Sequence, residues 1–144
     1  MFPIRTILHP TDFSASSEAA LVYACALAKD YSAEIVLLHV WEPLIVMGGE
    51  KYPQVPPNDV EETMARLNVL SVPEPSVKIT RKVVVGEPPE AIVREAKERH
   101  FDIIVMGTHG HTGLARILLG SVAEGVLRHA PCPVLTVRSA PKTA

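Results

Sequence analysis

The sequence predicts a single α/β domain in which helices cover both faces of a parallel β-sheet. Short apolar segments alternate with segments of helical periodicity along all 144 residues, and this alternation is typical of parallel sheets with right-handed crossovers. The composition is 47% hydrophobic but 5% aromatic, which indicates an aliphatic core around buried strands. Because the length suits one ordinary domain and no internal repeat is visible, we expect one domain over residues 1–144.

Five apolar segments are expected to form the strands of this sheet. The second segment is continuously apolar, so it is expected at the centre, where both of its faces are buried. Pro131 and Pro133 precede the last segment, and prolines at the start of a short strand are typical of a sheet edge. The expected strands are residues 5–9, 34–40, 77–85, 102–106 and 134–137.

Four segments carry the signals of helices. Ser14 is a natural N-cap for the first helix, which is expected to end around Asp30–Ser32. The second helix is expected over Asp59–Ser71, and Pro88 suits the first turn of the third. The fourth helix is expected over Ser121–His129. In the third helix the charged residues are expected to form a solvated face; they are Arg94, Glu95, Lys97, Glu98 and Arg99.

Two segments are expected to lie outside the regular elements. Residues 42–57 are rich in proline and glycine, which disfavour regular structure. A loop of this length in a small domain usually either has a function or is mobile. It is therefore interpreted equally well as a lid or partner surface beside the site and as a disordered insertion. Residues 139–144 are expected to form a flexible tail.

The charge and the cysteines bear on partners and compartment. The formal net charge of −2 provides no basic field for nucleic acid or an anionic membrane. No apolar run is long enough to span a bilayer, and no secretory signal is visible. Cys25 and Cys132 lack the spacing of metal ligands and are interpreted as cytosolic thiols. We therefore expect a cytoplasmic protein that binds neither nucleic acid nor membranes.

A glycine-rich loop follows the fourth expected strand. Gly107, Gly110 and Gly113 occur at three-residue steps, and Gly120-Ser121 begin the last helix. Glycines permit close approach, while exposed backbone N–H groups and a helix N-terminus attract anions. Because open α/β sheets bind ligands at the carboxyl ends of their strands, this loop predicts a phosphate site and therefore a nucleotide site. The alternative is a plain strand-to-helix connection.

Asp12 follows the first expected strand and is predicted to lie opposite the glycine-rich loop. There it could accept hydrogen bonds from a ribose or hold a cation such as magnesium beside phosphates. The alternative is a purely local Asx-turn. Val40 would supply a backbone edge and an apolar wall for a base. His109 and His111 lie two residues apart without a third ligand, so their spacing does not favour a transition-metal site.

These motifs resemble those of the universal stress protein family over nearly the whole chain. The resemblance rests on residues 7–14, on His39-Val40 and on the pattern G-x2-G-x9-G-[ST], present as Gly107, Gly110, Gly120 and Ser121. It implies a Rossmann-like fold, similar to the adenine nucleotide alpha hydrolases, with five parallel strands in the order 3-2-1-4-5. It also implies the ATP-binding branch of the family and a homodimer formed through Val134–Val137.

The resemblance also implies which residues bind the nucleotide. Residues at the ends of the first two strands would line the adenosine end, those after the fourth strand would lie along the nucleotide, and those at the last helix would clasp the phosphates. The implied residues are Pro10, Thr11, Asp12, Val40, Met106, Gly107, Thr108, His109, Gly110, Gly120, Ser121 and Val122. The chain departs from the family pattern at Gly125, inside the last helix, and in its short second helix.

Three functions are compatible with the sequence. The first is a nucleotide-dependent regulatory module of the stress response that binds ATP or AMP. The second is a slow ATPase or nucleotidyl-transferring enzyme in which Asp12 holds a metal and His109 or Ser121 lies near the γ-phosphate. The third is an interaction protein that does not depend on nucleotide. No arrangement of nucleophile, base and orienting acid is recognisable in the sequence, which favours the first.

Overall fold

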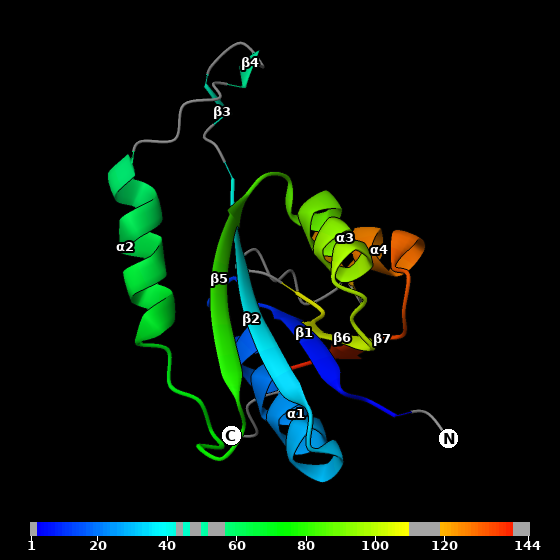
Figure 1. The fold of residues 1–144 in the computed structure, drawn as a ribbon. Coiled ribbons are helices and arrows are strands. Elements are labelled where there is room, and N and C mark those ends of the chain that lie inside the picture. The colour runs from blue at the N-terminus through cyan, green and yellow to red at the C-terminus, as the bar shows by residue number, and fades with distance from the viewer. Residues whose placement is uncertain (1–2, 43–44, 47–49, 52–56, 110–118, 140–144) are drawn as a thin grey trace, which may run out of the picture.

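The computed structural model describes the chain except for residues 1–2, 43–44, 47–49, 52–56, 110–118 and 140–144 (Figure 1). Strands and helices alternate along most of the chain, as the sequence predicts. In chain order the elements are β1 (Thr6–Pro10), α1 (Ala15–Tyr31), β2 (Glu34–Trp41), β3 (Ile45–Val46), β4 (Glu50–Lys51), α2 (Pro57–Asn68), β5 (Ile79–Val85), α3 (Pro88–Glu98), β6 (Ile103–Gly107), α4 (Ser121–His129) and β7 (Val134–Val137).

The main sheet has five strands in the order β5-β2-β1-β6-β7, and every neighbouring pair is parallel. Counted along the chain, this is the predicted order 3-2-1-4-5. The apolar strand β2 lies inside the sheet and β7 lies at its edge, which confirms both expectations. From β1 the chain builds the sheet toward β2 and β5, and then returns to build it toward β6 and β7. The strand order therefore reverses between β1 and β6, where open sheets form a ligand crevice.

The helices form one layer on each face of the sheet (Figure 1). Alternate residues of a strand point to opposite faces, and the core divides accordingly. Ile7 and Leu37 belong to the core under α1 and α2, whereas Leu8 and Leu38 belong to the core under α3 and α4. All four side chains are fully buried. None of the helices in the described parts of the chain has the length and apolar character needed to cross a membrane.

Local signals explain where the helices begin and end. Ser14 is the N-cap of α1, as predicted, and its hydroxyl oxygen accepts the Ser17 N–H at 3.2 Å. At the other end Ser32 adopts a left-handed conformation with φ 54°, and its N–H donates to the carbonyl of Ala28. The bounds of α4 and β7 agree with the sequence prediction.

The prediction for residues 42–57 was wrong in part. The short strands β3 and β4 pair in antiparallel fashion and lie beyond the carboxyl end of β2 (Figure 1). Helix α2 begins at Pro57, before the expected Asp59, because proline is well suited to the first turn of a helix. It ends at Asn68 rather than at Ser71. Pro10, expected to end the first strand, belongs to β1.

The prediction that Glu95 faces solvent was also wrong. Glu95 is 6% exposed, and its Oε1 lies 2.6 Å from Nζ of Lys82 on β5. A carboxylate this deeply buried requires a charged or hydrogen-bonding partner. The ion pair thus ties the edge strand β5 to α3, a long-range contact that helical periodicity does not reveal.

Candidate functional site

A pocket of about 490 Å³ lies at the carboxyl edge of the sheet, where β1, β2 and β6 end. This volume is within the range of roughly 300–1,000 Å³ usual for small-molecule sites. All the predicted site residues except Gly110 line it, and Gly110 lies outside the described residues. The predicted residues that line the pocket are Pro10, Thr11, Asp12, Val40, Met106, Gly107, Thr108, His109, Gly120, Ser121 and Val122.

Helix α4 presents an uncapped N-terminus to this pocket. Its N-cap residue, Gly120, has no side chain that could accept a hydrogen bond from the first turn. Glu124 is the first residue whose N–H donates within the helix, to the Gly120 carbonyl at 3.0 Å. The preceding N–H groups, of residues 121–123, have no acceptor among the described residues. All three residues line the pocket, so free donors and the positive end of the helix dipole meet there.

The N-terminus of α1 differs from that of α4 because the one first-turn residue that lines the pocket, Ser17, has its N–H capped by a side chain. Ser14 accepts the N–H of Ser17, and the Ser17 hydroxyl donates to the Ser14 carbonyl at 2.9 Å. Ser17 Oγ also accepts the Thr11 hydroxyl at 3.1 Å. An anion in the pocket would therefore be attracted more strongly to α4 than to α1.

The backbone on either side of the 110–118 segment is held by internal hydrogen bonds. The Thr108 N–H donates to the Val137 carbonyl at 3.1 Å, and the His109 N–H donates to Ser16 Oγ at 3.3 Å. The Gly120 N–H donates to the Thr108 carbonyl at 2.5 Å. The N–H of Gly120 is thus engaged within the protein, and the N–H groups without an acceptor among the described residues begin at Ser121.

Gly107 is required for the packing of α1 against the end of β6. A Cβ atom at this position would lie 2.5 Å from Ser16 Oγ and 2.7 Å from the Ser16 carbonyl carbon. The first turn of α1 thus occupies the space that a side chain would need. Gly107 also lines the pocket, so its role toward a phosphate stays a prediction.

Asp12 forms the Asx-turn that the sequence allowed as an alternative. Its Oδ1 accepts the Ser14 N–H at 2.9 Å, which orients the carboxylate at the end of β1. The same residue lines the pocket. Asp12 can therefore stabilise the turn after β1 and still contact a ligand in the pocket. Magnesium is commonly held by one or two carboxylates together with substrate phosphates. Asp12 and Glu42 are the carboxylates that line the described pocket, and the described residues contain no cluster of three or more potential metal ligands.

Sequence reasoning missed an aromatic and cationic group at the α2 side of the pocket. The Phe13 and His39 rings lie with their centroids 4.8 Å apart. Cζ of Arg66, on α2, lies 4.1 Å from the Phe13 centroid. Phe13 has a φ of 64°, an unusual conformation for a bulky residue. All three residues line the pocket, but no sequence pattern places α2 beside the turn after β1.

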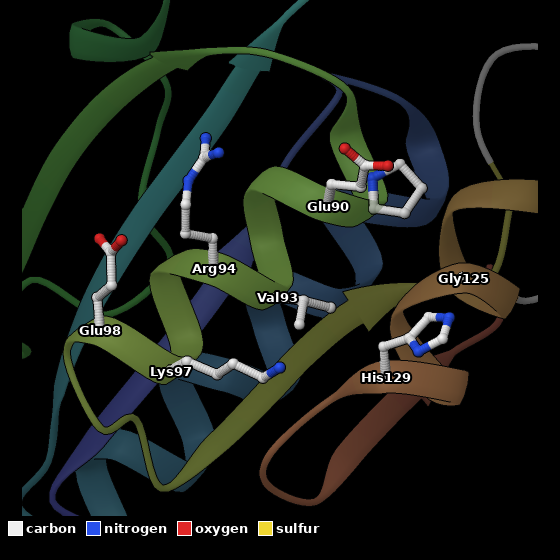
Figure 2. A pocket seen from close by; sticks show the side chains of 8 residues that line it. Glu90, Val93, Arg94, Lys97, Glu98, Gly125 and His129 are labelled. Carbon is white, nitrogen blue, oxygen red and sulfur yellow. The ribbon is translucent and has the colours of Figure 1, made fainter.

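A second hollow, of about 480 Å³, lies between α3 and α4 and contains none of the predicted site residues (Figure 2). Val93 and Gly125 line it together with charged side chains of both signs. Lys97 extends toward α4, whereas Arg94 and Glu98 point away from it (Figure 2). Because the described lining of this hollow comes from α3 and α4 alone, whereas β1, β2 and β6 all contribute to the first pocket, we take the pocket at the sheet edge as the candidate site.

Comparison with known proteins identifies the family. A model described as the universal stress protein family matches residues 3–138. The chain belongs to the universal stress protein family. Universal stress protein MJ0531 of Methanocaldococcus jannaschii is 36% identical over 144 residues, which cover 96% of this chain and 84% of the relative.

Solved structures agree with this membership. The structure of protein MJ0577 is 31% identical, with a TM-score of 0.71, and the match covers 99% of each chain. A universal stress protein in complex with cAMP is 26% identical, with a TM-score of 0.67, and the match covers 96% of this chain and 99% of that one. The predicted family and its five-stranded universal stress protein fold are thus confirmed.

Proposed function

We propose that this universal stress protein belongs to the ATP-binding branch of its family and acts as a regulatory module whose state depends on a bound adenine nucleotide. The carrying observation is that one pocket collects all the described residues that the sequence assigned to the nucleotide. The related structure in complex with cAMP supports an adenine nucleotide as the class of ligand. ATP and AMP are the proposed ligands.

The proposed orientation follows from where the donors and acceptors lie. Asp12 and Val40, at the ends of β1 and β2, would contact the ribose and the base, with Met106 as an apolar wall. The phosphates would bind at the first turn of α4, where residues 121–123 have backbone N–H groups without acceptors among the described residues. A helix N-terminus is a favourable position for phosphate.

A magnesium ion would enter together with ATP. Asp12, at the end of β1 and lining the pocket, would give the ion one carboxylate ligand. Phosphate oxygens and water would complete the octahedral shell that magnesium requires. The ion would neutralise phosphate charge and fix the position of the phosphate chain beside α4.

The experiment that tests this proposal removes one N–H donor without removing the helix. Ser121 is the first residue of α4, where proline is well tolerated, and Gly120 has the extended conformation (φ −70°, ψ 164°) that suits a residue before proline. In S121P the phosphate would lose one backbone donor. We expect about tenfold weaker ATP binding by calorimetry, equivalent to one charge-assisted hydrogen bond of about 1.5 kcal/mol.

S121A is the matched control, because it removes the hydroxyl and keeps the N–H group. It should bind ATP more tightly than S121P, and adenosine, which has no phosphate, should bind S121P and S121A equally. If neither ATP nor AMP binds the native protein, the proposal is wrong. If S121P weakens adenosine as much as ATP, the phosphates do not bind at α4.

We further propose that the protein is a cytoplasmic homodimer formed through β7. Leu135, at this edge of the sheet, is 36% exposed, and Leu127 on the neighbouring helix α4 is 42% exposed. An edge strand has backbone donors and acceptors that a second copy can pair. The free thiols Cys25 and Cys132 suit a reducing compartment.

A further inference from the structure

Arg66 brings a positive charge to the α2 side of the pocket. Its guanidinium stacks on the Phe13 ring, with Cζ 4.1 Å from the ring centroid. Within the described parts of the chain this guanidinium has neither an ion-pair nor a hydrogen-bond partner. Stacking occupies the flat face of a guanidinium and leaves its in-plane N–H donors available. Arg66 could therefore bind an anion without leaving the ring.

The ring beneath Arg66 is held in place by its surroundings. The Phe13 N–H donates to Thr11 Oγ1 at 3.1 Å, and the ring packs against His39. His39 is itself anchored, because its Nδ1–H donates to the Thr11 carbonyl at 2.7 Å. Phe13 adopts a left-handed conformation, and strained backbone of this kind tends to persist at ligand sites. The Phe13 ring, held by Thr11 and His39, thus gives the Arg66 guanidinium a fixed surface on which to stack.

The stacked side chains of Phe13 and Arg66 lie at the ribose end of the proposed nucleotide position. Phe13 directly follows Asp12, the proposed ribose ligand, whereas the first turn of α4 would hold the 5′-phosphates. Helices α2 and α4 cover opposite faces of the sheet (Figure 1), and both contribute to the pocket rim through Arg66 and Ser121. The pocket therefore has two groups that attract negative charge, one from the helix on each face of the sheet.

Building on the proposed function, we propose that Arg66 is a specificity-determining residue for adenine nucleotides that carry a second phosphate on the 2′ or 3′ oxygen of the ribose. The planar fork of a guanidinium matches two phosphate oxygens. An arginine beside the ribose is a general means of accommodating a phosphate on that sugar. Asp12 would bind the remaining ribose hydroxyl.

The test compares three nucleotides that differ at the ribose. AMP, adenosine 2′,5′-bisphosphate and adenosine 3′,5′-bisphosphate are titrated into the native protein by calorimetry. We expect one bisphosphate to bind about tenfold more tightly than AMP, as a charge-assisted bidentate contact at an exposed arginine would give. The bisphosphate that binds more tightly than AMP shows whether Arg66 binds a phosphate on the 2′ or on the 3′ oxygen of the ribose. The gain should shrink as salt is raised, because Arg66 is exposed.

Two variants isolate the guanidinium. In R66Q the ratio of bisphosphate to AMP affinity should fall from about ten to about one. R94Q is the matched control, because Arg94 is an exposed arginine on α3 that lines the other hollow, and it should retain the native ratio.

The outcomes separate this proposal from the proposed function. If AMP binds the native protein but neither bisphosphate binds more tightly, Arg66 does not recognise a phosphate on the ribose. The same conclusion follows if R66Q still binds one bisphosphate about tenfold more tightly than AMP. In both cases the proposed function stands. If none of the three nucleotides nor ATP binds, the proposed function fails, and this inference fails with it.

Discussion

His9 is a histidine buried in the central strand β1. It is 0% exposed, and its Nδ1–H donates to the Val105 carbonyl at 2.8 Å. Its Nε2 is buried and has no partner among the described residues. Burial lowers the pKa of His9 from 6.5 to about 4, although the Val105 hydrogen bond and the charge of Asp12 act in the opposite direction. The imidazole is therefore neutral in the folded protein at physiological pH.

The lowered pKa of His9 predicts a loss of stability in mild acid. Between pH 6.5 and about 4 the unfolded chain binds a proton at His9 that the folded protein does not. The free energy of unfolding should consequently fall as pH falls through this window, by about 3 kcal/mol in total. Urea denaturation at pH 7 and pH 4 measures this loss.

H9Q supplies the comparison for this measurement, because glutamine can still donate to the Val105 carbonyl but does not titrate. The native protein should lose about 3 kcal/mol more than H9Q between the two pH values. Equal losses in both proteins would show that another group causes the acid sensitivity.

At the scale of single residues, the sequence predicts well which positions lie close together at the site. It predicts less well which atoms each of these residues contacts. Pro10, Val40 and Met106 all lie at strand ends, so parallel topology alone brings them to one edge. The contact between Gly107 and Ser16 could not be predicted in this way, because only the packed structure shows that Ser16 fills the space beside the glycine. Arg66 likewise reaches the pocket through the placement of α2, which follows from long-range packing.

Gly125 shows how a residue that weakens a helix can be required by its packing. By propensity alone, glycine inside α4 costs about 1 kcal/mol relative to alanine. The structure explains its presence: a Cβ at Gly125 would lie 2.8 Å from Cβ of Pro89, on α3. The two helices lie side by side (Figure 2). The glycine lets α4 approach the first turn of α3 closely.

We therefore expect G125A to destabilise the protein, although helix propensity predicts the reverse. Overpacking of a close contact typically costs about 1–3 kcal/mol, which outweighs the gain in propensity. Urea denaturation of G125A, P89G and the double variant forms a thermodynamic cycle. Removing Cβ of Pro89 should relieve the clash, so G125A should cost less in the P89G background. An equal cost in both backgrounds would contradict the contact.

At the scale of elements, predictability follows the strength of local end signals. The bounds of α4 were predicted because Gly120 precedes it and Pro131 follows it closely. The start of α2 was misplaced because several prolines and glycines precede it, and the sequence does not distinguish the proline of a helical first turn, Pro57, from those of a loop.

At the scale of the whole molecule, composition and alternation were sufficient to predict the parallel sheet, and the family motifs supplied its strand order. The two edges of this sheet are not equivalent. Helix α2 packs on β5, and the Lys82–Glu95 pair ties this strand to α3. Strand β7 comprises four residues, and its side chain Leu135 is partly exposed. The proposed homodimer would extend the sheet at this second edge.

The hydrogen-bond pattern of β7 identifies a variant that tests the homodimer. The carbonyls of Pro133 and Val137 accept N–H groups from Ile104 and Thr108, on the β6 side. Because successive peptide groups of a strand point in opposite directions, the N–H of Thr136 faces the free edge.

T136P would remove this outward donor and leave the pairing with β6 in place, since prolines are tolerated on the free side of an edge strand. We expect the native protein and T136V, which keeps the N–H group and the branched shape, to elute as dimers with twice the chain mass in light scattering. T136P should elute as a monomer whose circular dichroism resembles that of the native protein. A monomeric native protein, or a T136P dimer as stable as the native one, would show that β7 does not pair with a second copy.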